Sequence, residues 1–217
     1  IYALPGQNLA QWEEDVASAV SLKPQHISAY ELKVEENTPF ECLLKSGDLH
    51  IPDDDLGCLM YDTSSRKLID AGDRHYEISN FALPGRRCLH NLNYWKNGQY
   101  LGFGAGAHSH INGERFSNIL HPIEYAASVM EQGHAVGFRE SLTPRAALGE
   151  ALILGLRLEE GIDVEDYSRR YCIPLLDEYA SVIEELTRMG LLERNGPRMR
   201  LTSRGYLLSD EVFVRFL

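Results

Sequence analysis

The stretch YEISNFALPGRRCLHNLNYWKNGQYLGFGAGAHSH, residues 76–110, holds most of the chemically informative residues of the chain. Apolar and polar side chains alternate from Tyr76 to Ser79, which predicts a strand with two different faces. Pro84 and Gly85 follow and are expected to end that strand. The segment therefore predicts one extended element that leads into a turn.

Three glycines, Gly102, Gly104 and Gly106, lie in a second segment from Tyr100 to His110 that we expect to be extended. Because they recur at every second residue, one face of such a strand would carry no side chains, and a flat ligand or another backbone could approach it closely. Tight packing inside a sheet explains the same glycines equally well. The pattern leaves both interpretations open.

The order of short motifs resembles the radical S-adenosylmethionine (radical SAM) family of HemW-type haem chaperones and oxygen-independent coproporphyrinogen III oxidases. The motifs are IYALPGQ, HISAYELKVEENTPF, YEISNFA, HNLNYW and YLGFGAGAHS, and together they cover essentially the whole chain. HNLNYW, residues 90–95, resembles HemW rather than the oxidase. The resemblance implies a protein that binds haem and delivers it to acceptor proteins. The alternative is a radical SAM oxidoreductase that decarboxylates coproporphyrinogen III to protoporphyrinogen IX.

The family holds its [4Fe-4S] cluster, together with S-adenosylmethionine, through a CxxxCxxC motif that this sequence lacks. Cys42, Cys58, Cys88 and Cys172 are too far apart to form a local set of iron-sulfur ligands. By the resemblance, Ile1 falls inside a strand, so we expect a C-terminal fragment whose cluster ligands lie upstream. Such a fragment is expected to be inactive alone and to self-associate through an uncovered sheet edge.

Strand and helix signals alternate over residues 1–140, which fits the C-terminal half of a partial, open α/β barrel. Asn8 and Gln11 predict a capping box for a helix that ends before Pro24, and the next strand is expected over 26–32. Such a strand-helix-strand unit implies neighbouring parallel strands.

Further along, residues 33–52 are expected to be a loop, and Gly133 and Gly137 to mark a linker. The acidic triplet Asp53-Asp54-Asp55 fits the positive end of a helix better than a metal site.

From Thr143 onward the pattern changes, and we place a domain boundary between residues 140 and 141. Thr143-Pro144 predicts the start of a helix, 164–171 a short one, and a single apolar stripe a longer helix over 175–189. A hairpin around Asn195-Gly196 follows. Residues 141–217 are therefore predicted to form a small winged-helix-like α+β domain.

The composition excludes some classes of function. The net charge is −11, and acidic residues outnumber basic ones on both sides of Thr143, so the nucleic-acid binding expected of a basic protein is disfavoured. A winged-helix DNA-binding regulator stays a remote alternative, because four arginines lie near the predicted hairpin: Arg194, Arg198, Arg200 and Arg204. No apolar run approaches the length of a membrane span. The few scattered cysteines suggest a reducing cytoplasm.

His90 and Cys88 are the candidate haem ligands, since imidazole and thiolate are common donors to haem iron. Tyr94 and Trp95 are candidates for stacking on the porphyrin. A hydrogen-bonded structural role is the alternative for His90. The resemblance further places five residues against S-adenosylmethionine: Ile1, Lys33, Leu92, Asn93 and His108.

Two other groups of polar residues have no assigned role. His108 and His110 are expected on one face of a strand, as a metal-chelating pair without an identifiable third ligand. Glu31, Glu35 and Glu77 lie near predicted strand ends, but no general acid or base can be assigned among them.

Overall fold

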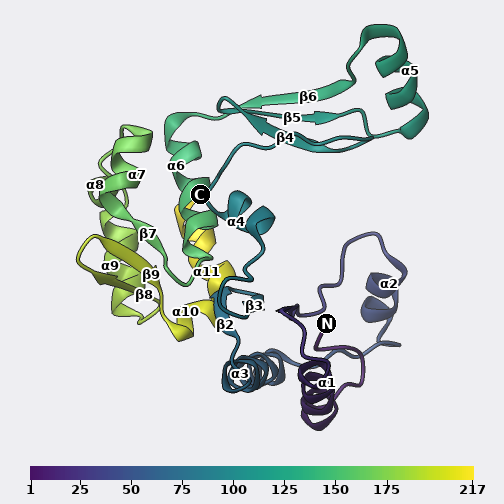
Figure 1. Cartoon of the computed structure of the whole chain (residues 1–217), viewed down its shortest axis with the longest axis vertical. Coiled ribbons are helices and arrows are strands. Elements are labelled where there is room, and N and C mark those ends of the chain that lie inside the picture. Colours follow the sequence, from purple (N-terminus) through teal and green to yellow (C-terminus); the bar gives the residue numbers. More distant parts are fainter. The chain divides into compact units, whose positions relative to one another are not determined.

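The computed structural model describes all residues from 1 to 217 (Figure 1). The chain forms two compact units, residues 1–88 and 89–217. Both units mix helices and strands, as the predicted α/β class requires. The domain boundary that we placed at residue 140 stays a prediction. None of the helices combines the length and the apolar character that a membrane span needs.

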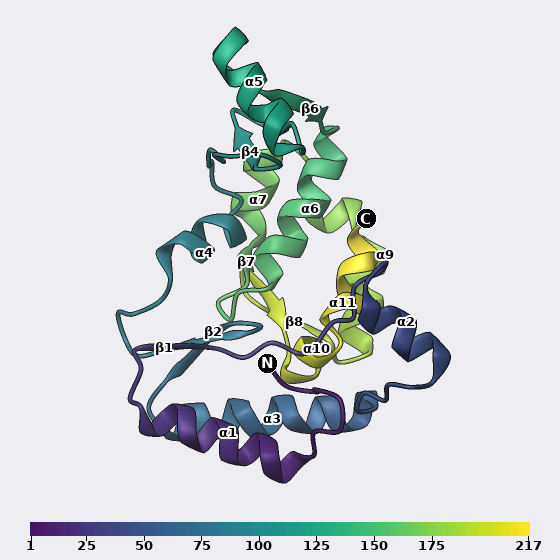
Figure 2. The ribbon, with the colours of Figure 1, turned by 90° about the vertical axis from the view of Figure 1, so that its right-hand side faces the viewer.

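The first unit contains three helices and a three-stranded sheet. They are α1 (Leu9–Ser21), β1 (His26–Ser28), α2 (Pro39–Ser46), α3 (Asp54–Asp70), β2 (Arg74–Glu77) and β3 (Asn80–Ala82). The sheet order is β1-β3-β2, and both pairings are antiparallel. Helices α1 and α3 lie side by side, as Figure 2 shows.

The core of this unit forms where α1 meets α3. Asn8 and Gln11 make the predicted capping box, and Asp53 caps α3 by accepting a hydrogen bond from the Leu56 amide. Trp12 is buried and donates its indole N–H to the Met60 carbonyl at 2.9 Å. Its burial, together with that of Met60, stabilises the contact between the two helices.

Two predictions for this unit were wrong. The segment from Tyr76 does not continue as one strand to Pro84, because β2 ends at Glu77 and β3 runs back antiparallel to it. The predicted parallel pairing between the first strand and the strand after α1 is present, but only as an isolated bridge between Tyr2 and Glu31. The stretch 33–52 contains helix α2, which Thr38 caps and whose first residue is a proline.

The second unit begins with a helix and a three-stranded meander. These are α4 (Leu89–Trp95), β4 (His108–Ile111), β5 (Glu114–Asn118), α5 (Pro122–Gln132) and β6 (Val136–Ser141), with sheet order β4-β5-β6. Figure 1 shows this sheet as an elongated arm that carries α5 at one end. Asn112 and Gly113 form the turn between β4 and β5 with φ values of 53° and 79°, as a two-residue hairpin turn requires.

Two further predictions failed in this region. The glycine run is not a strand: Gly104 and Gly106 have φ values of 103° and 69°, which place them in a turn before β4. The expected linker around Gly137 is strand β6, which pairs with β5.

The rest of the second unit is the predicted winged-helix-like module. It contains α6 (Pro144–Leu156), β7 (Ile162–Asp163), α7 (Val164–Tyr171), α8 (Leu175–Glu178), α9 (Ala180–Arg188), β8 (Leu192–Asn195), β9 (Arg198–Leu201), α10 (Ser203–Leu207), α11 (Ser209–Phe213) and the 3-10 helix η1 (Val214–Phe216). Its sheet order is β7-β9-β8.

The helix predicted over 175–189 is divided in two at Tyr179, whose backbone leaves the helical region with φ −113° and ψ 23°. The Tyr179 ring is buried, its hydroxyl donates to the Phe216 carbonyl, and the two rings pack at 5.3 Å. This packing against the end of the chain explains why α8 and α9 are separate helices.

Candidate functional site

The second unit contains a cavity of about 530 Å³ between α4, the β4–β5 hairpin, α6 and α7. We call it the aromatic cavity, because Tyr94, Trp95, Tyr100, His110 and Tyr171 form much of its lining. The volume lies within the range of small-molecule and cofactor sites. Its charged lining residues are Arg115, Glu150 and Arg170.

Helix α4 contains the HNLNYW motif, and a tight turn follows its C-terminal end. The Asn93 side chain donates to the Gln99 carbonyl at 3.0 Å, and the Gly98 amide donates to the Asn93 carbonyl at 2.8 Å. A side chain at position 98 would collide with Asn93, so the tight turn requires glycine there. This turn places Tyr94 and Trp95 on one side of it and Tyr100 on the other.

Four rings follow one another from α4 to β4. The His90 and Tyr94 ring centroids are 4.8 Å apart, those of Tyr94 and Tyr100 are 4.7 Å apart, and those of Tyr100 and His110 are 6.4 Å apart. Each pair meets edge to face, which is the favourable geometry for aromatic rings. His90 begins this series but is exposed and is not among the residues that line the cavity.

Trp95 is held from the side of α6. The Arg157 guanidinium lies 4.4 Å from the centre of the indole ring, a cation–π contact that orients the ring. The half-buried Trp95 therefore has a fixed position in the cavity wall.

The charged groups of the cavity are engaged by other protein groups. The two terminal nitrogens of Arg115 donate to the Glu150 carboxylate at 2.8 and 3.0 Å, and one of them also reaches Glu140 at 2.6 Å. Arg170 donates to the carbonyls of Lys96 and Asn97 at 3.2 and 2.9 Å. These contacts connect α6 to the hairpin and α7 to the turn after α4.

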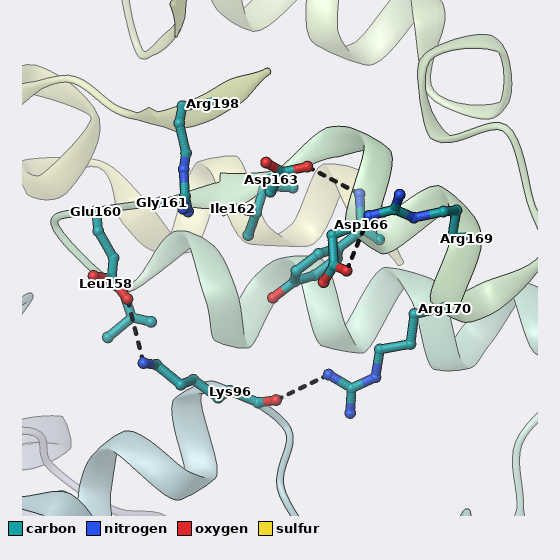
Figure 3. Close-up of a pocket in the computed structure, with 11 residues that line it drawn as sticks. Lys96, Leu158, Glu160, Gly161, Ile162, Asp163, Asp166, Arg169, Arg170 and Arg198 are labelled. Atoms are coloured by element: carbon teal, nitrogen blue, oxygen red, sulfur yellow. Dashed lines mark hydrogen bonds and ion pairs between the residues drawn. The ribbon is translucent and has the colours of Figure 1, made fainter. Parts of the chain in front are cut away.

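A second, polar pocket of about 460 Å³ lies beside α7 (Figure 3). Its charges are largely matched within the protein: Lys96 pairs with Glu160 at 3.4 Å, and Arg169 with Asp166 at 3.5 Å. Burial raises the pKa of Tyr167, which also lines it, to about 12. The pocket therefore has four basic and three acidic lining residues, a near balance that gives little preference for a charged ligand.

The first unit contains a cluster of buried polar groups next to β3. Glu77 and Asn80 have no exposed surface, and the Glu77 carboxylate accepts hydrogen bonds from the Asn80 amide and from the Ser79 N–H. Ser28 in turn donates to Asn80 at 2.5 Å. These bonds close the turn between β2 and β3, which indicates a structural role.

A second polar pair in this unit contacts the backbone of Cys88. Tyr76 accepts a hydrogen bond from the Cys88 N–H at 3.4 Å, and its hydroxyl lies 2.7 Å from Nε2 of His26. Burial lowers the pKa of His26, although Glu77 and Asp73 act in the opposite direction. Burial likewise raises the pKa of Tyr76.

The predicted haem residues are distributed over two units. Cys88 is the last residue of the first unit and is half-buried, whereas the exposed His90 lies in the first turn of α4. Tyr94 and Trp95 share the aromatic cavity. The sequence indicated no site role for Tyr100, although it begins the YLGFGAGAHS motif. It indicated none for Arg115 or Tyr171, which belong to no short motif and lie far along the chain.

The predicted S-adenosylmethionine contacts are also distributed. Ile1 and Lys33 are exposed in the first unit, while Leu92, Asn93 and His108 belong to the second. The Asn93 side chain is used in the turn after α4, and His108 is exposed on β4.

The described residues do not fit an iron-sulfur cluster. All four cysteines are free, and no group of three His, Cys, Asp or Glu side chains is placed to hold a metal ion. Cys42 lies in α2, Cys58 in α3 and Cys172 at the end of α7, so three of the four are on separate elements.

Comparisons with known proteins give one consistent assignment. The family model of the HemN C-terminal domain matches residues 142–208. The chain is 37% identical over all 217 residues to the protein called heme chaperone HemW of Bacillus subtilis, and 34% identical over 217 residues to that of Lactococcus lactis. It covers 57% of each of these proteins, so it spans little more than half the length of these relatives.

More distant relatives agree. The radical S-adenosyl methionine domain-containing protein 1 of Danio rerio is 34% identical over 228 aligned residues, which cover all of this chain and 51% of that protein. The fold matches the radical SAM enzyme coproporphyrinogen III oxidase (HemN) of Escherichia coli with a TM-score of 0.78 at 18% identity, over 99% of this chain and 53% of the enzyme. The chain is therefore similar over its whole length to HemW proteins, residues 142–208 match the HemN C-terminal domain, and the fold is that of the matching part of HemN.

Proposed function

We propose that this protein is a haem chaperone of the HemW type, which binds haem and transfers it to an acceptor protein. The observation that carries the proposal is the 37% identity to the heme chaperone HemW of Bacillus subtilis, which extends over every residue of the chain. Haem is the cargo in this proposal, and the cytoplasm is the proposed compartment.

The aromatic cavity supports the proposal because its lining suits a flat porphyrin. Tyr94 and Trp95 of the HNLNYW motif offer ring faces, and Trp95 is held in place by Arg157. A porphyrin buried there would gain from removal of apolar surface from water. Cys88 and His90 are the iron donors that the sequence indicates, and we keep both as candidates.

We further propose that S-adenosylmethionine contacts Ile1, Lys33, Leu92, Asn93 and His108. Names of more distant relatives include S-adenosylmethionine, which supports the cofactor class. Because the described cysteines do not assemble a cluster site, the proposal for this chain is limited to contacts with S-adenosylmethionine.

The proposal is tested by titrating the protein with ferric haem and then offering an excess of a haem-free acceptor such as apomyoglobin. We expect saturable binding with a Soret shift, followed by transfer to the acceptor. Tyr94→Ala should weaken the binding of both haem and iron-free protoporphyrin, since the lost ring contact does not involve iron. Phe138→Ala is the matched control, because Phe138 is a 58% exposed aromatic residue outside the cavity. Equal porphyrin affinity in the two variants would contradict a porphyrin site in the aromatic cavity.

Coproporphyrinogen III oxidation is the alternative, and the fold match to HemN favours it. Fold similarity alone does not determine chemistry, so the assay has to decide. Anaerobic incubation with S-adenosylmethionine, a reductant and coproporphyrinogen III distinguishes the two functions when it is carried out on a protein that joins this chain to a domain with the CxxxCxxC motif. Formation of protoporphyrinogen IX would replace the chaperone proposal with the oxidase.

A further inference from the structure

We propose that His110 supplies an imidazole ligand to the haem iron in the aromatic cavity. This inference rests on the proposed function, because it names a donor for the same cargo. The sequence suggested His110 only as half of a metal-chelating pair with His108 and not as a haem ligand, since it lies outside HNLNYW and follows it by fifteen positions (110 − 95).

The position of His110 is the first argument. Its half-buried ring lines the cavity together with Tyr94 and Trp95, the two side chains proposed to stack on the porphyrin. His90 belongs to the same helix as these aromatics but is exposed and contacts only the edge of the series through Tyr94. A planar ligand between the aromatic walls therefore meets His110 in the same cavity.

The hydrogen bonding of the ring is the second argument. Nδ1 of His110 lies 3.4 Å from the Gly98 carbonyl oxygen. A carbonyl only accepts hydrogen bonds, so this contact requires the proton on Nδ1 and leaves the lone pair on Nε2. Histidines that bind metals commonly donate their other ring N–H to a backbone carbonyl, which fixes the tautomer and the ring orientation. The Gly98–His110 contact has this arrangement.

The rigidity of the backbone on both sides of this contact is the third argument. The amide and carbonyl of His110 both pair with Tyr100 at 2.9 Å, and on its other side His110 is in register with Arg115 of β5. Gly98 is fixed by its bond to Asn93. The imidazole and its carbonyl acceptor are therefore both held by secondary structure, so little ordering is needed when iron binds. His90 forms no comparable side-chain hydrogen bond, and its helix is only seven residues long.

Haem titrations of four variants test the assignment: His110→Ala, His110→Asn, His90→Ala and His121→Ala. Asparagine places an N–H near the position of Nδ1, so His110→Asn can keep the bond to Gly98 while it removes Nε2. His121 is the control, because it is an exposed histidine of the same unit whose side chain caps nothing. Affinity for ferric haem, the Soret position and the electron paramagnetic resonance spectrum are recorded, and circular dichroism checks the fold.

We expect both His110 variants to bind ferric haem at least about tenfold more weakly, with a changed Soret band and spin state. Their affinity for iron-free protoporphyrin should stay close to that of the wild type, since the porphyrin contacts remain. Added imidazole should restore the wild-type spectrum of His110→Ala, and His121→Ala should behave like the wild type.

Wild-type haem affinity and spectrum in His110→Asn would overturn the assignment, and the same result in His110→Ala would do so if its fold is intact. A loss confined to His90→Ala or to Cys88→Ala would move the iron ligand to that residue. These outcomes leave the proposed function in place, because the wild type still binds haem. Absence of haem binding by the wild type would instead remove both the function and the ligand.

Discussion

The polar cluster of the first unit and the aromatic cavity of the second unit arrange hydrogen-bonding side chains in opposite ways. Glu77 and Asn80 have no exposed surface, and they bond to each other and to the backbone that they fold. His110 and Tyr94 instead line a cavity of about 530 Å³. Both regions draw these residues from the motif-rich stretch 76–110. Burial distinguishes the groups that maintain the fold from those that remain accessible to a ligand.

The largest predicted effect breaks the buried cluster. Asn80→Ala removes the amide that donates to the buried Glu77 carboxylate and the oxygen that accepts from the Ser28 hydroxyl, while the Ser79 N–H bond to Glu77 remains. Because the lost hydrogen bond is buried and involves an acidic side chain, we expect the unfolding free energy of the first unit to fall by about 3 kcal/mol. Chemical denaturation followed by the fluorescence of buried Trp12 measures this change.

Ser28→Ala is the control for that measurement. Ser28 is exposed and makes one of these hydrogen bonds, so its loss should cost about 1 kcal/mol. If Asn80→Ala cost no more than Ser28→Ala, the cluster would not be a structural element of the first unit.

A smaller effect is expected from glycine substitutions in the helices of the two units. A Cβ on Gly155 of α6 would lie 2.2 Å from the Tyr167 hydroxyl and 2.5 Å from Ile162, both buried in the second unit. Overpacking of this kind costs about 2 kcal/mol, so Gly155→Ala should lower the melting temperature. Differential scanning calorimetry gives the comparison.

The matched variant is Gly57→Ala in α3 of the first unit. There the Cβ meets only the end of the flexible Glu31 side chain, which can move away. Alanine favours helix by about 0.5–1 kcal/mol over glycine, so Gly57→Ala should be neutral or stabilising. Equal destabilisation by the two substitutions would show that the α6–α7 contact is not specially close.

The third prediction concerns pH and the first unit alone. Burial lowers the pKa of His26 in the folded state, whereas unfolded histidine titrates near about pH 6.5. The unfolded chain therefore binds the proton first as the pH falls, and the unfolding free energy should decrease from about pH 6.5 down to the lowered pKa of the folded state. Above about pH 6.5 this group should have no effect.

Urea unfolding at several pH values between about 5 and 8 tests that slope, with His26→Gln as the variant that should flatten it. Burial raises the pKa of Asp73, so the folded carboxyl still holds its proton as the pH rises through the ordinary aspartate range. This pH range lies below the one in which histidine titrates. An equal slope in wild type and His26→Gln would assign the pH dependence to other groups.

The features that the sequence predicted correctly depend on neighbours in the chain. Asn8 with Gln11, Thr143 with Pro144 and Asn112 with Gly113 each determine a cap or a turn from within a few residues. Such signals follow from local hydrogen bonds and backbone preferences, so one sequence is enough to find them.

The missed features depend on contacts between distant residues. The turn at Ile78-Ser79 has no glycine or proline and is closed by the Glu77 carboxylate, and the helix break at Tyr179 follows from packing against Phe216. The aromatic cavity likewise joins Tyr94 to Tyr171 across 77 positions (171 − 94). Motif spacing indicated Tyr94 and Trp95, but only the fold shows that His110 accompanies them.

The smallest expected effect tests whether the wall of the aromatic cavity also maintains the fold. Arg115 on β5 makes a two-pronged pair with Glu150 on α6, but their side chains are 35% and 30% exposed. Water screens such a pair, so a double-mutant cycle with Arg115→Met and Glu150→Gln should give a coupling of at most about 1 kcal/mol. The remaining contact of Arg115 with Glu140 is present in the Glu150→Gln arm, and the cycle subtracts it. A coupling near the cost predicted for Asn80→Ala would mean that the cavity wall is as structural as the buried cluster, and the contrast between the two regions would be lost. A small coupling with unchanged haem affinity would show that the pair is a weak, water-screened contact. Haem binding would then depend on the aromatic residues and His110.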